Sequence, residues 1–278
     1  ESINSEIIGK FWKKKSRFKN LNIFIIGNFK LIEDQFKILK IKIKIKKIND
    51  IANHKFNSEL LILDVPLNFK KPFQIPRINK RKYIISCLNL GIKLSLQKKI
   101  VGFINCPINK KEIFGNNNLG ITEFLGKKLG ISGKEVMLIF NKKLSVTPIT
   151  THIKLKRVSK SLSKKKIIDK IITINNFYLK NFKFKPKIAI LGLNPHNDEY
   201  RKDSEEKNII LPSIKKLRKN KISVYGPLSP DTAFINFKKR GFNVIVGMYH
   251  DQVLTPIKTI SGLNAINITL GLPFIRVS

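Results

Sequence analysis

The stretch SLSKKKIIDKIITINNFYLKNFKFKPKIAILGLNPH, residues 161–196, contains the pattern on which the fold class depends. Its first part, 161–182, is long and charged and repeats apolar residues at helical spacing, which predicts an amphipathic helix. Its later part, 187–193, is a short apolar run that is typical of a buried strand. A helix followed directly by a buried strand is half of a βαβ unit, so the stretch indicates an α/β fold.

The same alternation extends over the rest of the chain and predicts a mainly parallel sheet. The predicted strands are 21–27, 40–45, 60–63, 101–106, 135–141, 187–193, 223–225 and 243–249. The clearest predicted helices are 3–14, 122–129, 161–182, 205–220 and 231–239, the last capped by Asp231. The run KIKIKIKK at 40–47 predicts an edge strand with one lysine face, a common protection against edge pairing.

Length and composition favour a soluble α/β protein with a sizeable core, since the chain has 278 residues and 42% of them are hydrophobic. The two cysteines, Cys87 and Cys106, form no CxxC pair, which argues against a disulfide framework and a zinc ribbon and suits a reducing cytoplasm. Lysines interrupt every apolar run before it reaches the roughly 18 residues of a membrane span. The N-terminus lacks the order of a secretory signal, so we expect a mature cytoplasmic chain without membrane contact.

The net charge of +37 would by itself suggest a nucleic-acid or anionic-membrane partner. The charge is mostly lysine, however, and it is dispersed along the chain, whereas nucleic-acid binding favours arginine forks with aromatic side chains beside them. Lysine is abundant together with isoleucine, asparagine and phenylalanine, the residues of A- and T-rich codons. We therefore predict a solvated lysine surface and no specific nucleic-acid site, with a functional basic patch as the alternative.

Three of the four histidines end apolar segments: His152 in SVTPITTH, His196 in KIAILGLNPH and His250 in NVIVGMYHDQ. Ligands of open α/β sheets bind at the carboxyl ends of strands, where three imidazoles would form a divalent-metal site with open positions for substrate. A single histidine after a strand is usually structural. His54 has no such placement, and we interpret it as structural too. The shared placement of the other three favours a metal site.

Several charged and polar residues accompany these histidines. Asp251 follows His250 directly and is a candidate partner for its second ring nitrogen. Asp231 is either a helix cap or a residue of the same site. Four further residues are candidates for holding a phosphate or carboxylate: Thr122, Lys258, Asn267 and Arg276. The sequence contains no GxGxxG, GxxxxGK[ST] or GxSxG motif, so no Rossmann fingerprint, P-loop or nucleophile elbow is predicted.

Seven phrases in this order, CPINK, GITEFL, TTH, GLNPH, GPLSPDT, MYHDQ and ITLGLPFIR, resemble those of the 4-hydroxythreonine-4-phosphate dehydrogenase family along nearly the whole chain. The resemblance implies two α/β domains with a cleft between them, in the isocitrate/isopropylmalate dehydrogenase-like fold. We assign 1–107 with 254–278 to the first domain and 108–253 to the second, which would carry the metal ligands and the dimer interface. The resemblance also implies that the natural chain extends beyond both ends of this sequence.

The resemblance further implies a homodimer with its active site at the subunit interface. On the matching positions, His152, His196 and His250 would bind a divalent metal (zinc, magnesium, manganese or cobalt), with both subunits contributing. Thr122, Lys258, Asn267 and Arg276 would contact the substrate, while Asp231 and Asp251 would be acidic residues of the catalytic site. The implied reaction oxidises 4-phosphohydroxy-L-threonine with NAD or NADP, and the β-keto acid product loses carbon dioxide to give an amino-ketone phosphate for pyridoxine synthesis.

Ile121 departs from the family, which has a substrate-binding histidine at this position of the GITE phrase. A related dehydrogenase of a four-carbon phosphorylated hydroxy acid, such as threonate or erythronate phosphate, is therefore the alternative enzyme. A basic nucleic-acid-binding protein is the alternative outside enzymes. The segments that the family has beyond both ends make NAD binding by this sequence a weaker expectation than metal binding.

Overall fold

The computed structural model describes residues 3–18, 21–52, 54–56, 58–115, 120–131 and 133–278. By its contacts the chain divides into two compact units, Glu1–Asn118 and Leu119–Ser278. This division groups 254–278 with the second unit, whereas the sequence assigned that segment to the first domain. The domain assignment and the cleft stay predictions, because contacts within one chain do not show which parts move as rigid bodies.

The first unit contains a small parallel sheet with the strand order β1-β3-β2. Its elements are α1 (Asn4–Trp12), a 3₁₀ turn (Lys15–Phe18), β1 (Ile25–Gly27), α2 (Phe29–Ile38), β2 (Ile45–Ile48), β3 (Leu60–Asp64), α3 (Arg77–Leu96), β4 (Gly102–Ile104) and α4 (Lys110–Phe114). Asn28 caps α2 by accepting the Leu31 N–H at 2.9 Å.

The lysine-rich run at 40–47 contributes the edge strand of this three-stranded sheet. The regular strand begins later than predicted, at Ile45, but the side chains alternate as expected: Lys42, Lys44 and Lys46 are exposed, while the isoleucines between them are half-buried. The prediction of an edge strand with one lysine face is confirmed for β2.

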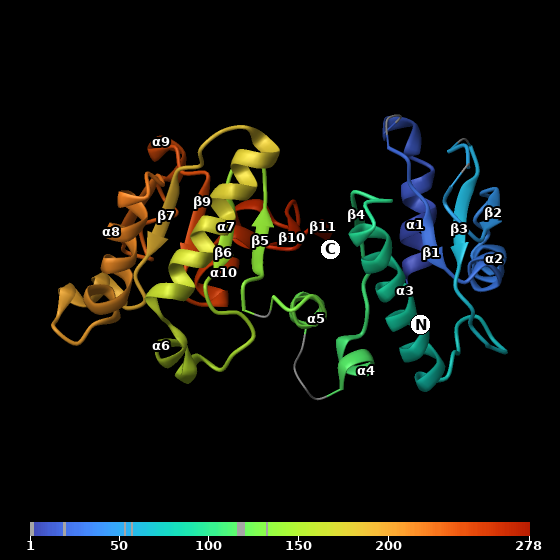
Figure 1. Cartoon of the computed structure of the whole chain (residues 1–278), viewed down its shortest axis with the longest axis horizontal. Helices are drawn as coiled ribbons and strands as arrows, with labels where there is room; N and C mark the ends of the chain where they lie inside the picture. The colour runs from blue at the N-terminus through green and yellow to red at the C-terminus, as the bar shows by residue number, and fades with distance from the viewer. Residues whose placement is uncertain (1–2, 19–20, 53, 57, 116–119, 132) are drawn as a thin grey trace. The chain divides into compact units, whose positions relative to one another are not determined.

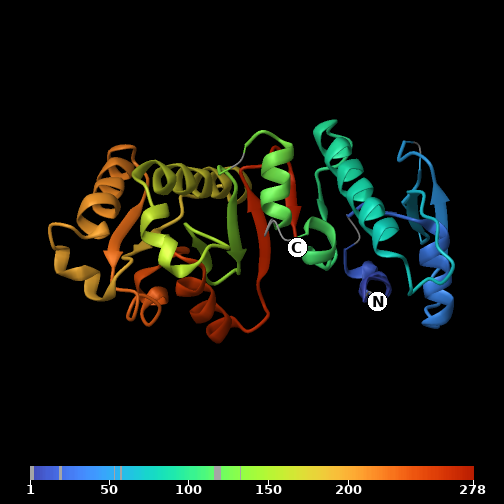
Figure 2. The same cartoon turned by 90° about the horizontal axis from the view of Figure 1, so that it is seen from below.

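Apolar side chains of β3 alternate between the two faces of this sheet. Leu60 and Ile62 pack with residues of α1 and α2, whereas Leu61 and Leu63 pack with Leu94 of α3. The first unit is thus a layer of strands between helices, and Figure 2 shows α3 (teal) and α2 (blue) on opposite sides of the strands.

The second unit has one larger sheet, in which strands of the unit follow the order β11-β10-β5-β6-β9-β7-β8. Its strands are β5 (Val136–Phe140), β6 (Ser145–Pro148), β7 (Ile188–Leu191), β8 (Val224–Leu228), β9 (Val244–Gly247), β10 (Ile266–Leu270) and β11 (Ile275–Val277). Its helices are α5 (Ile121–Lys128), α6 (Val158–Ser161), α7 (Lys164–Phe182), α8 (Leu211–Lys219), α9 (Phe237–Arg240) and α10 (His250–Ser261). Shorter helical segments are Leu155–Arg157, Pro195–Tyr200 and the π-helical Glu206–Ile210.

This sheet is mixed rather than mainly parallel. The strands β6, β9, β7 and β8 pair in parallel, while β5, β10 and β11 are antiparallel to their neighbours. The sequence showed strand-like character but no strand bounds at β6, β10 and β11, and it did not indicate their antiparallel pairing.

Two apolar clusters sandwich the second sheet. Ile188 and Ile190 of β7 face the cluster that contains α7, whereas Ala189 and Leu191 face the cluster that contains Val253 and Ile257 of α10. Figures 1 and 2 show α7 and α10 on opposite faces of the strands. This alternation at period two buries both faces, as expected for an α/β sheet.

Most predicted helices form with small shifts of their ends. The exception is 231–239, where the structure has a turn followed by the short α9, whose N-cap residue is Asn236. The prediction that Asp231 caps a helix is therefore wrong. In the ranges that the structure describes, no helix is long and apolar enough to cross a membrane.

Candidate functional site

A buried cation and two hydroxyl groups meet where β10, β11 and α5 come together. Arg276 Nη1 donates to Thr269 Oγ1 at 2.9 Å and to Thr122 Oγ1 at 3.5 Å, and the two hydroxyl oxygens lie 3.2 Å apart. Thr269 and Arg276 are paired across the antiparallel strands, which places their side chains on the same face. We call these three residues the arginine cluster.

Arg276 is only 2% exposed, and no other residue of the cluster is charged. Burial lowers its pKa to about 10, and nearby Glu123 opposes that effect. The guanidinium therefore stays charged at neutral pH. A buried cation with two hydroxyl neighbours is well suited to bind an anionic group.

The first turn of α5 brings Thr122 to the cluster. Gly120 is the N-cap residue, and within the described residues it makes no side-chain cap hydrogen bond. The N-terminal peptide dipoles therefore add partial positive charge beside Thr122. Glu123 counteracts part of this field: a Cβ on Gly120 would meet Glu123 Oε2, so the carboxylate lies over the same helix end.

Lys258 and Asn267 line one pocket of about 170 Å3, with apolar walls that include Ile139, Ile257 and Leu263. The Asn267 Oδ1 atom is buried and has no hydrogen-bond partner among the described residues. An unsatisfied buried acceptor is costly, so this oxygen is available to a hydroxyl or amino group of a ligand. Lys258 is exposed at the pocket and supplies a mobile positive charge.

The pocket and the arginine cluster share one face of the sheet. Asn267 and Thr269 are two residues apart on β10, and side chains at this spacing point to the same side of a strand. Asn267 and Ser278 donate backbone hydrogen bonds to each other in the same β10–β11 pairing that holds Thr269 opposite Arg276. The structure therefore brings all four predicted substrate contacts to one side of the second unit.

Two of the predicted metal ligands lie side by side. His152 follows β6, and His250 is the first residue of α10 after β9, with ring centroids 5.7 Å apart. β6 and β9 pair in parallel, and Thr150 extends their contact by donating from its N–H and its hydroxyl to Met248 O. The carboxyl ends of the two strands therefore hold the histidines together, as the sequence predicted.

His250 has the expected acidic neighbour. Its Nδ1 atom lies 2.7 Å from Asp251 Oδ1, which leaves Nε2 as the nitrogen for another ligand. A carboxylate on one ring nitrogen fixes the orientation of an imidazole and makes its other nitrogen a better ligand. The geometry is the one that the predicted role of Asp251 requires.

His196 lies in the turn after β7, the strand that pairs with β9 on the side away from β6. It is exposed, and it is close enough to Asp231 to contribute, after the nearby Ser229 hydroxyl, to lowering the pKa of that carboxyl. Asp231 is therefore near His196 rather than at a helix end. Among the described residues, no group of three histidine, cysteine or acidic side chains is close enough to hold a metal ion.

The donor set nevertheless fits a divalent cation in part. Two imidazoles bound at 2.0–2.1 Å to one tetrahedral ion have ring centroids about 5 Å apart. The 5.7 Å separation of His152 and His250 is close to this value, and imidazole nitrogen donors suit zinc better than magnesium or manganese. One chain thus brings two candidate ligands together, and the metal role of all three histidines stays a prediction.

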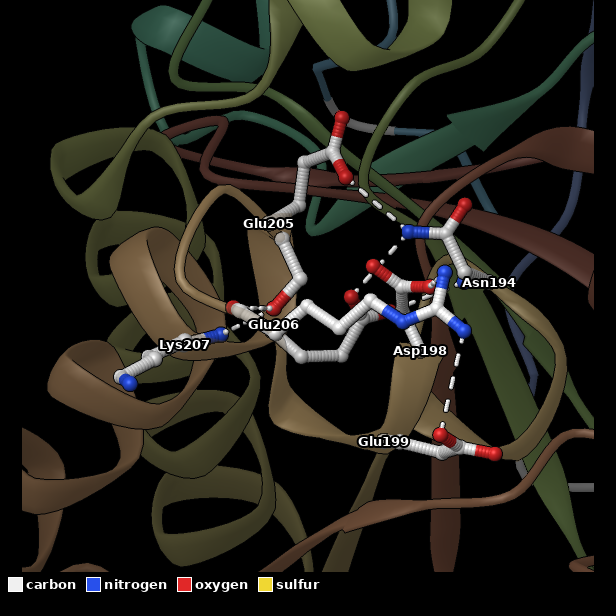
Figure 3. Close-up of polar contacts among 8 residues, drawn as sticks. Asn194, Asp198, Glu199, Glu205, Glu206 and Lys207 are labelled. Atoms are coloured by element: carbon white, nitrogen blue, oxygen red, sulfur yellow. Dashed lines mark hydrogen bonds and ion pairs between the residues drawn. The ribbon is translucent and has the colours of Figure 1, made fainter.

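A buried carboxylate, which the sequence did not single out, holds the turn before His196. Glu206 Oε1 accepts the N–H groups of Leu193 at 2.7 Å and Asn194 at 2.8 Å, and its Oε2 accepts Asn194 Nδ2 at 3.1 Å (Figure 3). The same amide donates to Glu205 Oε2 at 3.0 Å. Burial would raise the pKa of Glu205, but hydrogen bonds that include those from Ser159 and Asn194 outweigh it and lower the pKa.

Thr269 was also missed, although the alternation of a strand through Asn267 would have placed it on the same face. No comparable signal existed for Glu206, whose local sequence resembles that of an ordinary surface glutamate in a helix.

Ile121, which replaces the histidine of the resemblance, is the first residue of α5 and is 5% exposed.

Solved structures with this architecture define the class of protein. A 4-hydroxythreonine-4-phosphate dehydrogenase from Burkholderia phymatum superimposes with a TM-score of 0.84 at 26% identity, over 100% of this chain and 86% of that one. The chain thus has the isocitrate/isopropylmalate dehydrogenase-like α/β fold, and the predicted fold class is confirmed.

Sequence comparisons give the family. The 4-hydroxythreonine-4-phosphate dehydrogenase of Sulfurihydrogenibium sp. is 40% identical over 99% of this chain and 85% of its own length. The D-threonate 4-phosphate dehydrogenase of Salmonella typhimurium is 31% identical over 88% of this chain and 76% of its own. The family model of the pyridoxal phosphate biosynthetic protein PdxA matches residues 19–278, and the chain belongs to this family. The resemblance found in the sequence is confirmed.

Proposed function

We propose that this chain is an NAD- or NADP-linked, metal-dependent dehydrogenase of 4-phosphohydroxy-L-threonine that acts in pyridoxal phosphate synthesis. The observation that carries the proposal is the buried arginine cluster on the same sheet face as the Lys258–Asn267 pocket. The cations Arg276 and Lys258 suit the phosphate of such a substrate, and the unsatisfied Asn267 Oδ1 suits its hydroxyl or amino group. Relatives with the name of this activity support it.

The arginine cluster is the proposed binding site for the anionic end of the substrate. Thr122 and Thr269 fix the guanidinium of Arg276 through its Nη1 atom, which holds this buried positive charge in place for an anionic group. Lys258 adds charge at the pocket, and the Asn267 amide oxygen accepts from a hydroxyl or ammonium group. Together these residues orient the carbon that is oxidised.

His152, His196 and His250 are the proposed holders of a zinc, magnesium, manganese or cobalt ion, with both subunits of a homodimer contributing. Such an ion, when bound, acidifies a substrate hydroxyl. Asp251 keeps the Nδ1 side of His250 occupied, so that Nε2 is directed to the ligand, and Asp231 supplies a negative charge near His196. Asp251 thereby fixes the orientation of the His250 ring.

The overall reaction is oxidation of the secondary alcohol. A bound NAD or NADP would supply the acceptor for the hydride on the alcohol carbon, while the hydroxyl proton would pass to solvent. The product is a β-keto acid, which releases carbon dioxide because its carbonyl accepts the electrons of the broken bond. The remaining product is 3-amino-2-oxopropyl phosphate. We further propose a cytoplasmic location and no specific nucleic-acid partner.

The test is reduction of NAD and NADP by the purified chain with 4-phosphohydroxy-L-threonine, with and without added zinc, magnesium, manganese or cobalt. The expected result is reduction that requires both the substrate and a metal. A second assay uses the chain extended at both ends, because the family continues beyond this sequence. Metal-independent reduction, or none in either form, contradicts the proposal.

A second candidate function is oxidation of D-threonate 4-phosphate or its erythronate isomer. It is favoured by Ile121, which cannot donate a hydrogen bond, and by the relatives of that name. The same assay distinguishes the candidates, since the favoured function requires the substrate amino group for good turnover. Faster reduction with threonate phosphate would make the second candidate the function.

A further inference from the structure

Glu206 is a carboxylate with no contact to solvent, as its exposed fraction is 0%. No ion pair with Glu206 is found within the described part of the chain, and its hydrogen bonds come from two backbone N–H groups and one side-chain amide. A buried carboxylate is usually paired with a cation or satisfied by several donors, because dehydration of the charge is costly. Here the donors alone compensate for the charge.

All three donors belong to Leu193 and Asn194, the residues that begin the turn after β7. Two consecutive N–H groups that point at one oxygen fix the orientation of two peptide planes. The next link is a hydrogen bond from the Asn197 N–H to Asn194 O at 3.2 Å. The carboxylate therefore determines where the turn that contains His196 leaves the sheet.

The turn itself needs such support. Residues 196–199 all have positive φ angles between 47° and 59°, a left-handed conformation that side chains with a Cβ rarely adopt. A run of such residues persists only where surrounding contacts over-determine it. At its base, a Cβ on Gly192 would come within 3.1 Å of Glu206 Oε1 and would also meet Asn197 Oδ1, so the carboxylate, the strand end and the turn are in close contact.

We infer that Glu206 is a positioning residue that fixes the His196 turn for metal binding. The inference rests on the proposed function, because it takes His196 as a metal ligand. In Figure 3 the carboxylates of Glu205 and Glu206 lie on either side of the Asn194 amide, which donates to both. Glu206 thus acts on His196 through Asn194, at the start of the turn. Glu206 touches neither substrate nor metal in this account.

Glu206→Gln is the decisive variant. The glutamine oxygen can still accept from the two backbone N–H groups, but the glutamine NH₂ group replaces the oxygen that accepted from Asn194 Nδ2, so two donors face each other. Asp203→Asn is the matched control, because Asp203 is exposed in the same loop and undergoes the same chemical change. Asn194→Ala is a milder second variant, which removes the side-chain bond and keeps both backbone bonds. His196→Ala tests the proposed ligand itself.

The experiment measures zinc and cobalt affinity of each folded, metal-free full chain by calorimetry at low temperature, with circular dichroism to confirm folding. We expect Glu206→Gln to weaken metal binding about ten- to a hundredfold, as loss of support around a ligand does, with a smaller loss for Asn194→Ala and none for Asp203→Asn. If Glu206→Gln does not fold, the Asn194→Ala result decides.

A merely structural role predicts that the folded variants bind metal as tightly as the unsubstituted chain, and that result would overturn the inference. The His196→Ala variant separates the two possible failures. If it loses metal binding while Glu206→Gln and Asn194→Ala do not, only the positioning role is wrong. If His196→Ala also binds metal normally, the proposed metal site is wrong.

Discussion

Arg276 and Thr269 face each other across the β10–β11 pair, and the guanidinium donates to the hydroxyl at 2.9 Å. This contact lies in the antiparallel part of the second sheet, whereas His152 and His250 lie at the ends of its parallel strands. The candidate anion site and the candidate metal site thus depend on two different kinds of strand pairing within one sheet.

The first prediction concerns the Thr269 hydroxyl. Thr269→Val keeps the shape of the side chain but removes the acceptor of the Arg276 bond. Because hydrogen bonds to charged groups contribute about 1.5–3 kcal/mol, kcat/KM for the phosphorylated substrate should fall roughly ten- to a hundredfold. Steady-state kinetics measures the effect. Thr147→Val is the control, since Thr147 is also buried and its hydroxyl has no partner among the described residues. Equal kinetics of both variants would exclude a role for the hydroxyl.

The second prediction concerns the contact between His250 and Asp251. Asp251→Asn removes the charge that orients the imidazole, while the amide oxygen can still accept from Nδ1. Loss of such a partner typically costs about 10- to 100-fold in metal affinity, so zinc should bind about that much more weakly. Titration of the metal-free chain measures it. Asp169→Asn, a change on α7, is the control. Unchanged zinc affinity in the Asp251 variant would show that the 2.7 Å contact does not serve metal binding.

The third prediction is a pH dependence caused by Lys170 on α7. Burial lowers its pKa to about 8, an effect that Glu135 only partly offsets. The unfolded chain therefore binds more protons than the folded chain between about pH 8 and the ordinary lysine pKa near 10.4, and this lysine adds stability as pH rises through that range. Lys170→Met should raise the free energy of unfolding by a few kcal/mol, about 2–3, at pH 7 and by much less near pH 10.5.

Urea unfolding of the Lys170→Met variant at both pH values measures this difference. Lys165→Met serves as the control, because Lys165 is an exposed lysine of the same helix. A gain in stability that is the same at pH 7 and pH 10.5 would mean that packing of the methionine, and not the lysine charge, is responsible.

The fourth prediction concerns the net charge of +37. Dispersed lysines should bind DNA and RNA weakly at low salt and without sequence preference. Since such binding depends on counterion release, it should disappear by about 0.2 M salt. Fluorescence anisotropy with two unrelated oligonucleotides measures it. Selective binding that persists at that salt concentration would establish the basic surface as a functional site.

The sequence predicted the parallel part of the fold because buried strands such as 187–193 are continuous apolar runs bounded by turn residues. It did not predict the bounds or the antiparallel pairing of β10 and β11. Their side chains alternate between the core and a polar site, so Asn267, Thr269 and Arg276 interrupt the apolar pattern. The polar residues of the candidate site therefore made these two strands difficult to recognise from the sequence.

The sequence identified those candidate site residues that can be recognised from their residue type and from their position after a strand, such as His152 and His250. It was not predicted where the role depends on long-range packing. Glu206 accepts hydrogen bonds from residues 12 and 13 positions away, and nothing in its local sequence indicates a side chain that is fully buried. The prediction of a helix at 231–239 was wrong for a related reason, because local helix propensity does not specify the turn that precedes α9.

The last prediction concerns Ile121, which begins α5 directly before Thr122 of the arginine cluster and is only 5% exposed. Ile121→His places a ring that donates hydrogen bonds beside this cluster. A hydrogen bond to an anionic substrate contributes about 1.5–3 kcal/mol, so kcat/KM for 4-phosphohydroxy-L-threonine should rise roughly ten- to a hundredfold. The gain should require the phosphorylated form of the substrate. Burial of the polar ring should at the same time lower the free energy of unfolding by about 1–3 kcal/mol.

Both effects are measured on Ile121→His and on Ile121→Leu, which keeps an apolar side chain of the same size and should change neither kcat/KM nor stability by much. The kinetics compare the amino acid substrate with D-threonate 4-phosphate, using a chain that binds the nicotinamide cofactor. Suppose that the histidine variant gains nothing with the amino acid, while the unsubstituted chain oxidises threonate phosphate faster. Ile121 then determines substrate choice, because an apolar side chain at this position would select the substrate without the amino group, and the second candidate function is the correct one.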